Sequence, residues 1–239
     1  MRDGSAGPPV VFGVTIQCVH PMKAAPKAPM PDHTHDGFLG AVYGSDSADD
    51  LARHYDGWAA TYDAEMARVG YRHPSIALAL LTRHLQRGAA PVLDAGCGTG
   101  LLGEWLGIAG YPHIEGLDLS DGMLAVAASK GAYKNLLRAA LGGPLAFADG
   151  HFAGIVAAGV FSTGHVGPEG LDELIRICRR GGVIVLTVKN TLWESGFAGR
   201  IADLEHNGKI TRCEETAPYV SMPGEVGTSP SRALALRVV

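Results

Sequence analysis

Short apolar runs alternate with amphipathic segments along this chain from about residue 90 onward. Brief apolar runs bounded by Gly, Pro or Asp are typical of buried strands, whereas longer segments with one polar face are typical of helices. Strands followed by helices predict an α/β fold: a doubly wound, mostly parallel sheet with helices on both faces. The pattern predicts strands at 92–95, 113–119, 134–141, 154–160 and 183–189, and helices at 100–109, 120–129 and 168–178.

Two more helices are predicted before the first strand, at 47–62 and 74–86. Ser47 can cap the first of them, and Ser120 can cap the helix after the second strand, because a serine hydroxyl accepts from the exposed N–H groups of a first turn. These early helices predict an N-terminal helical lid over about residues 46–88.

Neither end of the chain continues the alternation of strands and helices seen in the middle. Residues 190–239 are expected to return to the sheet, with 233–239 as a last, antiparallel strand. Residues 1–37 lack periodicity and end in a stretch rich in Pro and Ala, so they are predicted to be a disordered extension preceding one domain at 38–239. A short apolar stretch at 9–19 leaves a signal peptide as a less favoured alternative.

Composition narrows the class of protein. The chain has 239 residues, of which 46% are hydrophobic, and a formal net charge of −4. That content excludes a disordered chain, and the absence of any Lys/Arg run makes nucleic acid a poor candidate partner. No run is long enough to cross a membrane. The four cysteines form no C-x-x-C pair, so neither disulfides nor a metal site is expected, and a cytoplasmic location is predicted.

The most informative segment is 92–100, Val-Leu-Asp-Ala-Gly-Cys-Gly-Thr-Gly. An apolar run ends in Asp94, and glycines then alternate, which predicts a strand, a tight turn and the start of a helix. Glycine is needed where the backbone takes a positive φ or lies against a ligand. Twenty residues beyond Gly98, Asp118 closes the next strand, where a carboxylate can accept hydrogen bonds from both ribose hydroxyls of a nucleoside.

Two nucleoside cofactors fit these residues. Gly98-Thr-Gly-Leu-Leu-Gly103 satisfies G-x-G-x-x-G, which supports a nicotinamide dinucleotide and hence an oxidoreductase. However, Asp94 places an acid in the turn region, where it would repel a pyrophosphate. The same acid suits the cationic amino-acid end of a sulfonium cofactor.

The arrangement D-x-G-x-G-x-G at 94–100 resembles motif I of the class I S-adenosylmethionine (SAM) methyltransferases, and 116–124 resembles their second-strand motif. Segments elsewhere are similar to the Williams–Beuren-region methyltransferase-like group, and the resemblance runs from about residue 37 to the C-terminus. The resemblance implies a Rossmann-like class I methyltransferase fold and SAM as cofactor, but it names no methyl acceptor. The segments that resemble this group are 55–63, 70–74, 159–166 and 192–197.

The resemblance also implies a set of cofactor-binding residues. Tyr62 is expected either to cover the cofactor from the lid or to pack its helix onto the domain, and Met123 either to contact adenine or to belong to the core. The set is Tyr62, Asp94, Gly96, Cys97, Gly98, Gly100, Asp118, Leu119, Met123, Ala140, Leu141 and Gly159.

Candidates on the acceptor side follow the fourth and fifth strands. His165 can act as a base or orient a hydroxyl, and Trp193 can stack on a flat substrate; the alternatives are a loop histidine without a role and a tryptophan that caps the sheet. Lys189 and Asn190 are further candidates on the acceptor side, and Lys189 is predicted to be a solvated strand end. A general base is needed only when the acceptor is protonated.

Two departures from the family pattern matter. Ala140 stands where related sequences carry an acid that accepts from the adenine amino group, and Ala153 replaces an acid at the start of the fourth strand. A lost charge-assisted hydrogen bond is worth roughly 1.5–3 kcal/mol. The sequence therefore predicts SAM-dependent methyl transfer to a small molecule, with a non-catalytic SAM-binding regulatory domain as the alternative and an NAD-dependent oxidoreductase as a weaker one.

Overall fold

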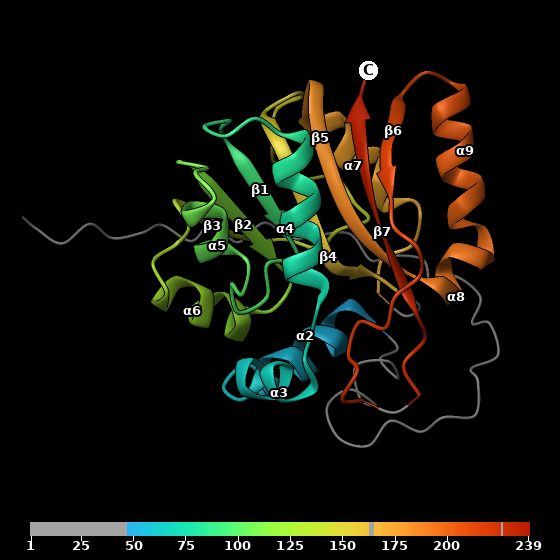
Figure 1. Ribbon diagram of the computed structural model, residues 1–239. Helices are drawn as coiled ribbons and strands as arrows, with labels where there is room; N and C mark the ends of the chain where they lie inside the picture. The colour runs from blue at the N-terminus through green and yellow to red at the C-terminus, as the bar shows by residue number, and fades with distance from the viewer. Residues whose placement is uncertain (1–46, 163–164, 226) are drawn as a thin grey trace, which may run out of the picture.

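A seven-stranded sheet forms the centre of the computed structural model, which describes residues 47–162, 165–225 and 227–239 (Figure 1). The strand order is β3-β2-β1-β4-β5-β7-β6. Within this sheet β7 runs in the opposite direction to the other strands, so its pairs with β5 and β6 are antiparallel. The order reverses between β1 and β4, which is where ligands bind in sheets of this kind. The strands are β1 (Val92–Ala95), β2 (Ile114–Asp118), β3 (Asn135–Arg138), β4 (Phe152–Phe161), β5 (Cys178–Lys189), β6 (Ile210–Glu215) and β7 (Ser231–Val238).

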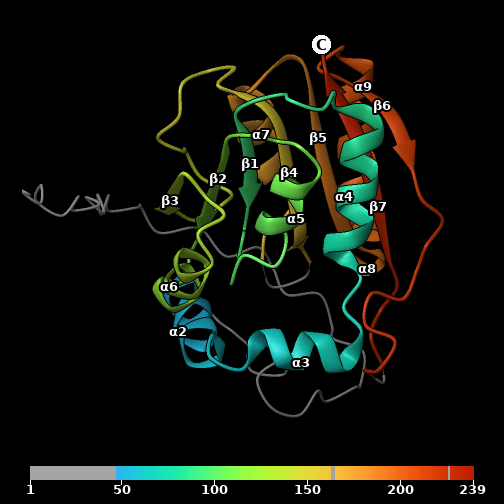
Figure 2. The same cartoon turned by 60° about the vertical axis from the view of Figure 1, so that its left-hand side comes forward.

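Helices cover both faces of the sheet and one of its ends. In Figures 1 and 2, α4 lies across one face, α7 lies on the other, and α2 and α3 lie beyond the carboxyl ends of the parallel strands. The lid is therefore placed over the predicted ligand site. The helices are α2 (Ala48–Trp58), α3 (Tyr62–Val69), α4 (His73–His84), α5 (Gly103–Ile108), α6 (Asp121–Ser129), α7 (Gly170–Ile177), α8 (Asn190–Leu192), the π-helical turn η1 (Trp193–Phe197) and α9 (Ala198–His206).

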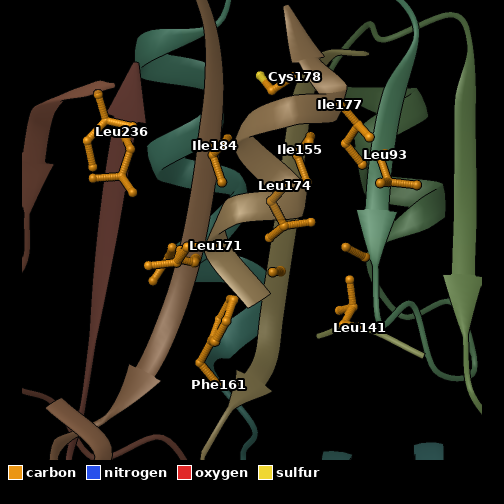
Figure 3. Packing of buried hydrophobic residues seen from close by; sticks show 14 of the residues in the cluster. Leu93, Leu141, Ile155, Phe161, Leu171, Leu174, Ile177, Cys178, Ile184 and Leu236 are labelled. Atoms are coloured by element: carbon orange, nitrogen blue, oxygen red, sulfur yellow. The ribbon is translucent and has the colours of Figure 1, made fainter. Parts of the chain in front are cut away.

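The core consists of two apolar layers separated by the sheet. Val183 and Val185 of β5 pack with α4 and α5, whereas Ile184 and Leu186 pack with α7 and α9. Figure 3 shows the second layer, with the apolar side of α7 against β1, β4 and β5. Helices cover β5 on both faces, and this explains why its sequence is almost continuously apolar.

Most predicted elements are confirmed, including the two caps and the antiparallel last strand. Ser47 Oγ accepts from Asp50 N at 3.1 Å, and Ser120 Oγ accepts from Met123 N at 3.0 Å. β7 pairs antiparallel with β5 from Val183 to Lys189.

Several boundaries differ from the prediction: β5 begins at Cys178 instead of 183, β3 ends at Arg138 instead of 141, and two of the predicted helices change. The helix expected at 47–62 is two helices, α2 and α3, separated by a turn in which Thr61 N donates to Trp58 O. The helix expected at 100–109 begins only at Gly103, because Gly98 and Gly100 have φ values of +53° and +81°, which no α-helix accommodates.

The extension predicted at 1–37 lies outside the described residues. None of the helices within the described ranges has the length and apolarity needed to cross a membrane.

The sheet core gives a matched pair of substitutions. Ile155 in β4 is fully buried between β1 and α7, whereas Ile108 at the end of α5 is 74% exposed. We expect Ile155→Ala to lower the free energy of unfolding by about 2–5 kcal/mol and Ile108→Ala to change it by less than about 0.5 kcal/mol. Urea denaturation of both variants measures this; equal losses would contradict the placement of β4 in the core.

Candidate functional site

The glycine turn after β1 binds the end of β2 directly. Gly98 N donates to Asp118 Oδ2 at 2.8 Å, and Ser120 N donates to Asp118 Oδ1 at 3.0 Å. A Cβ built on Gly98 would meet no atom within 4 Å, whereas one on Gly96 would lie 2.5 Å from a methyl group of Val160. The turn is therefore open to a ligand at Gly98 and packed against β4 at Gly96. Gly100 also faces inward, towards Tyr133 and Ala127.

Asp94 lies beneath this turn. It is 2% exposed, and its Oδ2 accepts a hydrogen bond from Tyr133 Oη at 2.7 Å. Burial raises the pKa of the Asp94 carboxyl to about 7, and the charge of Asp118 acts in the same direction, while the Tyr133 hydrogen bond opposes both. Nothing in the sequence marks Tyr133 as the partner of this acid, because the two residues meet only in the folded chain.

Two acids of the lid bind the same region. Asp56 Oδ1 of α2 accepts from Ser120 Oγ at 2.5 Å and from Gly122 N at 2.8 Å, so it holds the first turn of α6. Asp63 of α3 accepts from Thr99 in the glycine turn and from Lys130 Nζ at the end of α6. Neither contact was predicted from the sequence, because the acids and their partners lie far apart along the chain.

An apolar contact accompanies these polar ones. Met123 of α6 is 1% exposed and packs in one cluster with Trp58, Met66 and Met222. The Tyr62 ring meets the Trp58 ring edge-on, with 4.9 Å between centroids. The lid is thus fixed to the domain by an apolar cluster as well as by two carboxylates.

A cavity of about 60 Å³ lies between the lid and the carboxyl ends of β4 and β5. His165 is on its wall: His165 Nδ1 lies 2.8 Å from Ser162 Oγ, and His165 Nε2 lies 3.0 Å from Tyr55 Oη. Both ring nitrogens therefore have a hydroxyl partner, which fixes the ring. The lining residues are Tyr55, Trp58, Tyr62, Met66, Tyr71, His73, Gly159, Phe161, Ser162, His165, Lys189 and Met222.

Lys189 and His73 form the deep end of the cavity. The expectation that Lys189 is a solvated strand end is wrong, because the residue is only 9% exposed. His73 Nδ1 lies 2.7 Å from Tyr219 Oη, and burial, with the charge of Lys189, lowers the pKa of His73 to about 3. The imidazole of His73 is therefore neutral at physiological pH.

The chain is similar to known proteins in sequence and in fold. The family model described as "Methyltransferase domain" matches residues 93–186. Human methyltransferase-like protein 27 is 34% identical over 161 residues, which are 64% of this chain. The matched part spans 65% of the length of that relative.

Solved structures extend the comparison of folds. A TehB-like SAM-dependent methyltransferase from Corynebacterium glutamicum has a TM-score of 0.54 at 21% identity and covers 78% of this chain and 98% of its own. The [4+2]-cyclase SpnF has a TM-score of 0.59 at 14% identity and covers 81% of this chain and 97% of its own. The chain has the fold of the class I SAM-dependent methyltransferases, and its residues 93–186 match the methyltransferase domain model. SAM is the cofactor of this class of methyltransferases.

In this methyltransferase domain, the predicted cofactor residues occupy three different environments. Gly96 and Gly98 lie in the glycine turn, which is bonded to the Asp118 carboxylate, and Gly159 and Tyr62 line the cavity. The thiol of Cys97 is instead buried, and lies 3.0 Å from where a Cβ on Gly116 would be.

The remaining predicted contacts follow β2 and β3. Leu119 accepts from Arg138 through its carbonyl at 3.2 Å, and Leu141 is 7% exposed within the core layer of Figure 3. Ala140 is the second residue after β3; its neighbour Ala139 donates to Asp118 O at 3.0 Å, which holds this segment beside the ribose-binding candidate.

Trp193 does not join His165. It lies in η1, where its ring packs near Phe197 and is covered by the Arg232 guanidinium at 4.6 Å, and it is not part of the cavity wall. This position agrees with the alternative prediction for Trp193, a tryptophan that caps the sheet, and not with one that stacks on a substrate. Asn190 likewise accepts from Arg232 and donates to Glu194.

Ala153 lies far from the cofactor side of the methyltransferase sheet. It is fully buried near the start of β4, and its N–H donates to Pro91 O just before β1. Because β1 and β4 are parallel, this is the amino edge of the sheet, opposite the glycine turn. An alanine here does not remove a cofactor contact, so the expectation based on Ala153 is wrong.

Asp94 makes the stability of the methyltransferase domain depend on pH. Its pKa in the folded state, about 7, exceeds the ordinary value of 3.8, so protonation favours the folded state and its contribution is lost as the pH rises from about 4 through 7. Each pKa unit corresponds to about 1.4 kcal/mol, so the loss is roughly 4 kcal/mol.

We therefore expect Asp94→Asn, which keeps an acceptor for Tyr133, to raise the free energy of unfolding at about pH 8 by roughly 4 kcal/mol more than at about pH 4. Denaturant unfolding at several pH values measures the difference. Asp121→Asn, at an acid whose side chain is 64% exposed, is the control and is expected to show no such trend. A flat profile for Asp94→Asn would contradict the burial of an ionisable Asp94.

Proposed function

We propose that this chain transfers the methyl group of SAM to a small-molecule acceptor bound in the cavity under the lid. One observation supports this most strongly: the cavity and the glycine turn share neighbouring residues. Tyr62 lines the cavity while Asp63 bonds Thr99 of the turn, and Gly159 lines the cavity while Val160 touches Gly96. A cofactor on the turn would therefore present its reactive end to the cavity.

The residues present fit the cofactor. Gly98 leaves space where a ligand can approach the backbone, and Asp118 offers a carboxylate fixed by two N–H groups, in the position that accepts from ribose hydroxyls. We propose that Gly96, Gly98, Asp118 and the segment at Ala140 hold SAM. When bound, SAM supplies an electrophilic methyl group and a neutral leaving group.

The chain itself must position the acceptor, exclude water and accept a proton where the acceptor carries one. The lid closes the cavity through α2 and α3, which serves the first two tasks. For the third, we propose His165, because Ser162 fixes its orientation and its other nitrogen faces the Tyr55 hydroxyl in the cavity. An acceptor hydroxyl that replaces Tyr55 at Nε2 would deliver its proton there.

The acceptor is proposed to be small. Lid residues close one side of the cavity, which limits the size of an acceptor that can enter it. The net charge of −4 also offers no general attraction for nucleic acid. A cytoplasmic setting is proposed as well, supported by the free thiols of Cys97, Cys178 and Cys213.

A non-catalytic SAM-binding domain is the second candidate, and Ala140 favours it. The missing acid removes one charge-assisted contact to adenine, unless another group replaces it. The cyclase SpnF, which shares the fold, also shows that this architecture is not tied to one reaction.

A dinucleotide-dependent oxidoreductase is disfavoured by the glycine turn. The hydroxyl of Thr99 in that turn already donates to Asp63, so it is not available to a pyrophosphate. In addition, α5 is only six residues long and begins at Gly103, so it provides a weak dipole for an anion.

Calorimetry with SAM, S-adenosylhomocysteine and NADH tests the cofactor, and release of S-adenosylhomocysteine over a metabolite panel tests turnover. Binding of SAM with turnover of at least one metabolite supports methyl transfer. Binding without turnover supports the regulatory domain, and preference for NADH would overturn both.

Asp118→Ala is expected to weaken SAM binding by roughly 1.5–3 kcal/mol, because it removes a carboxylate that accepts from two ribose hydroxyls. Isothermal titration measures the affinity. Asp121→Ala, three residues away with a side chain that is 64% exposed, is the matched control and should bind SAM like the unchanged protein. Unchanged affinity in a folded Asp118→Ala protein would remove Asp118 from the site.

Ala140→Asp is expected to tighten SAM binding by about 1 kcal/mol, which is less than a full charge-assisted bond because the new carboxylate must lose water. An analogue that lacks the adenine amino group should gain nothing. Equal gains for both ligands, or a loss for SAM, would show that another group already accepts from the adenine.

A further inference from the structure

Lys189, the last residue of β5, is a buried cation on the wall of the proposed acceptor cavity. Its exposed fraction is 9%, and its Nζ donates to Ser221 Oγ and to Ser229 O, each at 3.2 Å. Both partners are neutral oxygens. An ammonium group has three donors, so these two bonds leave one N–H uncommitted among the described residues.

No carboxylate compensates this charge in the described part of the chain. Burial alone lowers the pKa of Lys189, to about 8, and no acid acts on it. The group therefore remains mostly protonated at pH 7. Buried ammonium groups are normally paired with an anion, because the cost of taking the charge out of water is otherwise uncompensated.

The other titratable groups that face Lys189 carry no negative charge near pH 7. His73 is neutral, since its pKa is about 3, and burial raises the pKa of Tyr219 above its usual value of 10. Neither Asp nor Glu is among the residues that line the cavity. Among the described residues, the cavity wall therefore carries the Lys189 ammonium and no carboxylate to balance it.

The rest of the cavity wall is aromatic and apolar. The rings of Tyr55 and Trp58 are stacked with centroids 6.1 Å apart, and Tyr71 meets His73 edge-on at 5.2 Å. Met66 and Met222 complete this side. Such walls suit a flat, apolar body, which aromatic faces and thioethers contact favourably.

We propose that the methyl acceptor carries an oxyanion, a carboxylate or a phosphate, on a flat apolar body, and that Lys189 binds this oxyanion. This inference rests on the proposed function, because it assigns the cavity to the acceptor. Lys189 then acts as a specificity residue: it distinguishes an acid from its neutral counterpart. His165, on the same wall, serves the reacting group in the proposed function.

Matched pairs of probes test the charge preference directly. Benzoate, 4-hydroxybenzoate and phenylacetate are compared with their primary amides, and phenyl phosphate is compared with phenol, by calorimetry at pH 7 with S-adenosylhomocysteine saturating. We expect the favoured acid to bind roughly 10- to 100-fold more tightly than its neutral twin. The carboxylates and the phosphate form separate arms, so the tighter arm identifies the oxyanion.

Three variants assign that preference to a residue. Lys189→Met and Lys189→Gln are expected to reduce the ratio of acid to amide affinity to about one while the affinity for the amide stays the same; the glutamine retains a donor for Ser221 if the methionine variant does not fold. Lys134→Met, at an exposed lysine at the start of β3, is the matched control and should keep the full ratio.

The outcomes separate this inference from the proposed function. Failure of S-adenosylhomocysteine to bind the unchanged protein would overturn the proposed function. Normal binding of S-adenosylhomocysteine with equal affinities for acids and neutral twins, or with no binding by any acid, would overturn the inference alone. A ratio that survives both Lys189 substitutions would also overturn it.

Discussion

The hydrogen bond from Gly98 N to Asp118 Oδ2 is the contact on which the site depends. It joins the ends of β1 and β2, next to the point between β1 and β4 where the strand order reverses, and it requires a backbone that turns through positive φ at Gly98. A side chain at that position would be strained and would also occupy the open space above the turn. The same bond places a carboxylate and a bare stretch of backbone side by side, which is the arrangement that a nucleoside with an attached cation needs.

The lid extends this arrangement. Asp56 and Asp63 bond the first turn of α6 and the glycine turn, so α2 and α3 are positioned by the groups that surround the cofactor site. The same helices supply Tyr55, Trp58 and Tyr62 to the cavity wall, so direct contacts connect the glycine turn with the cavity.

Two buried ionisable groups, Asp94 and Lys189, lower the stability of the folded protein at the candidate site. Asp94 and Lys189 both have pKa values shifted towards their neutral forms by burial, and neither is paired with an opposite charge in the described residues. Such groups are commonly retained at functional sites, where a ligand of opposite charge compensates them. A cationic cofactor near Asp94 and an anionic acceptor near Lys189 would offset both costs.

The sequence by itself determined the elements that follow from local rules. Hydrophobic periodicity gave the strands and helices, serine caps gave two helix starts, and spaced glycines with Asp118 predicted the cofactor turn, because each of these depends on residues close together in the chain. The environments of Asp94, His165, Lys189 and Ala153 were decided only by the tertiary structure. Tyr133 reaches Asp94 across 39 residues, Tyr55 reaches His165 across 110, and Ser221 reaches Lys189 across 32. Burial and charge pairing are properties of such distant contacts, which no local pattern encodes.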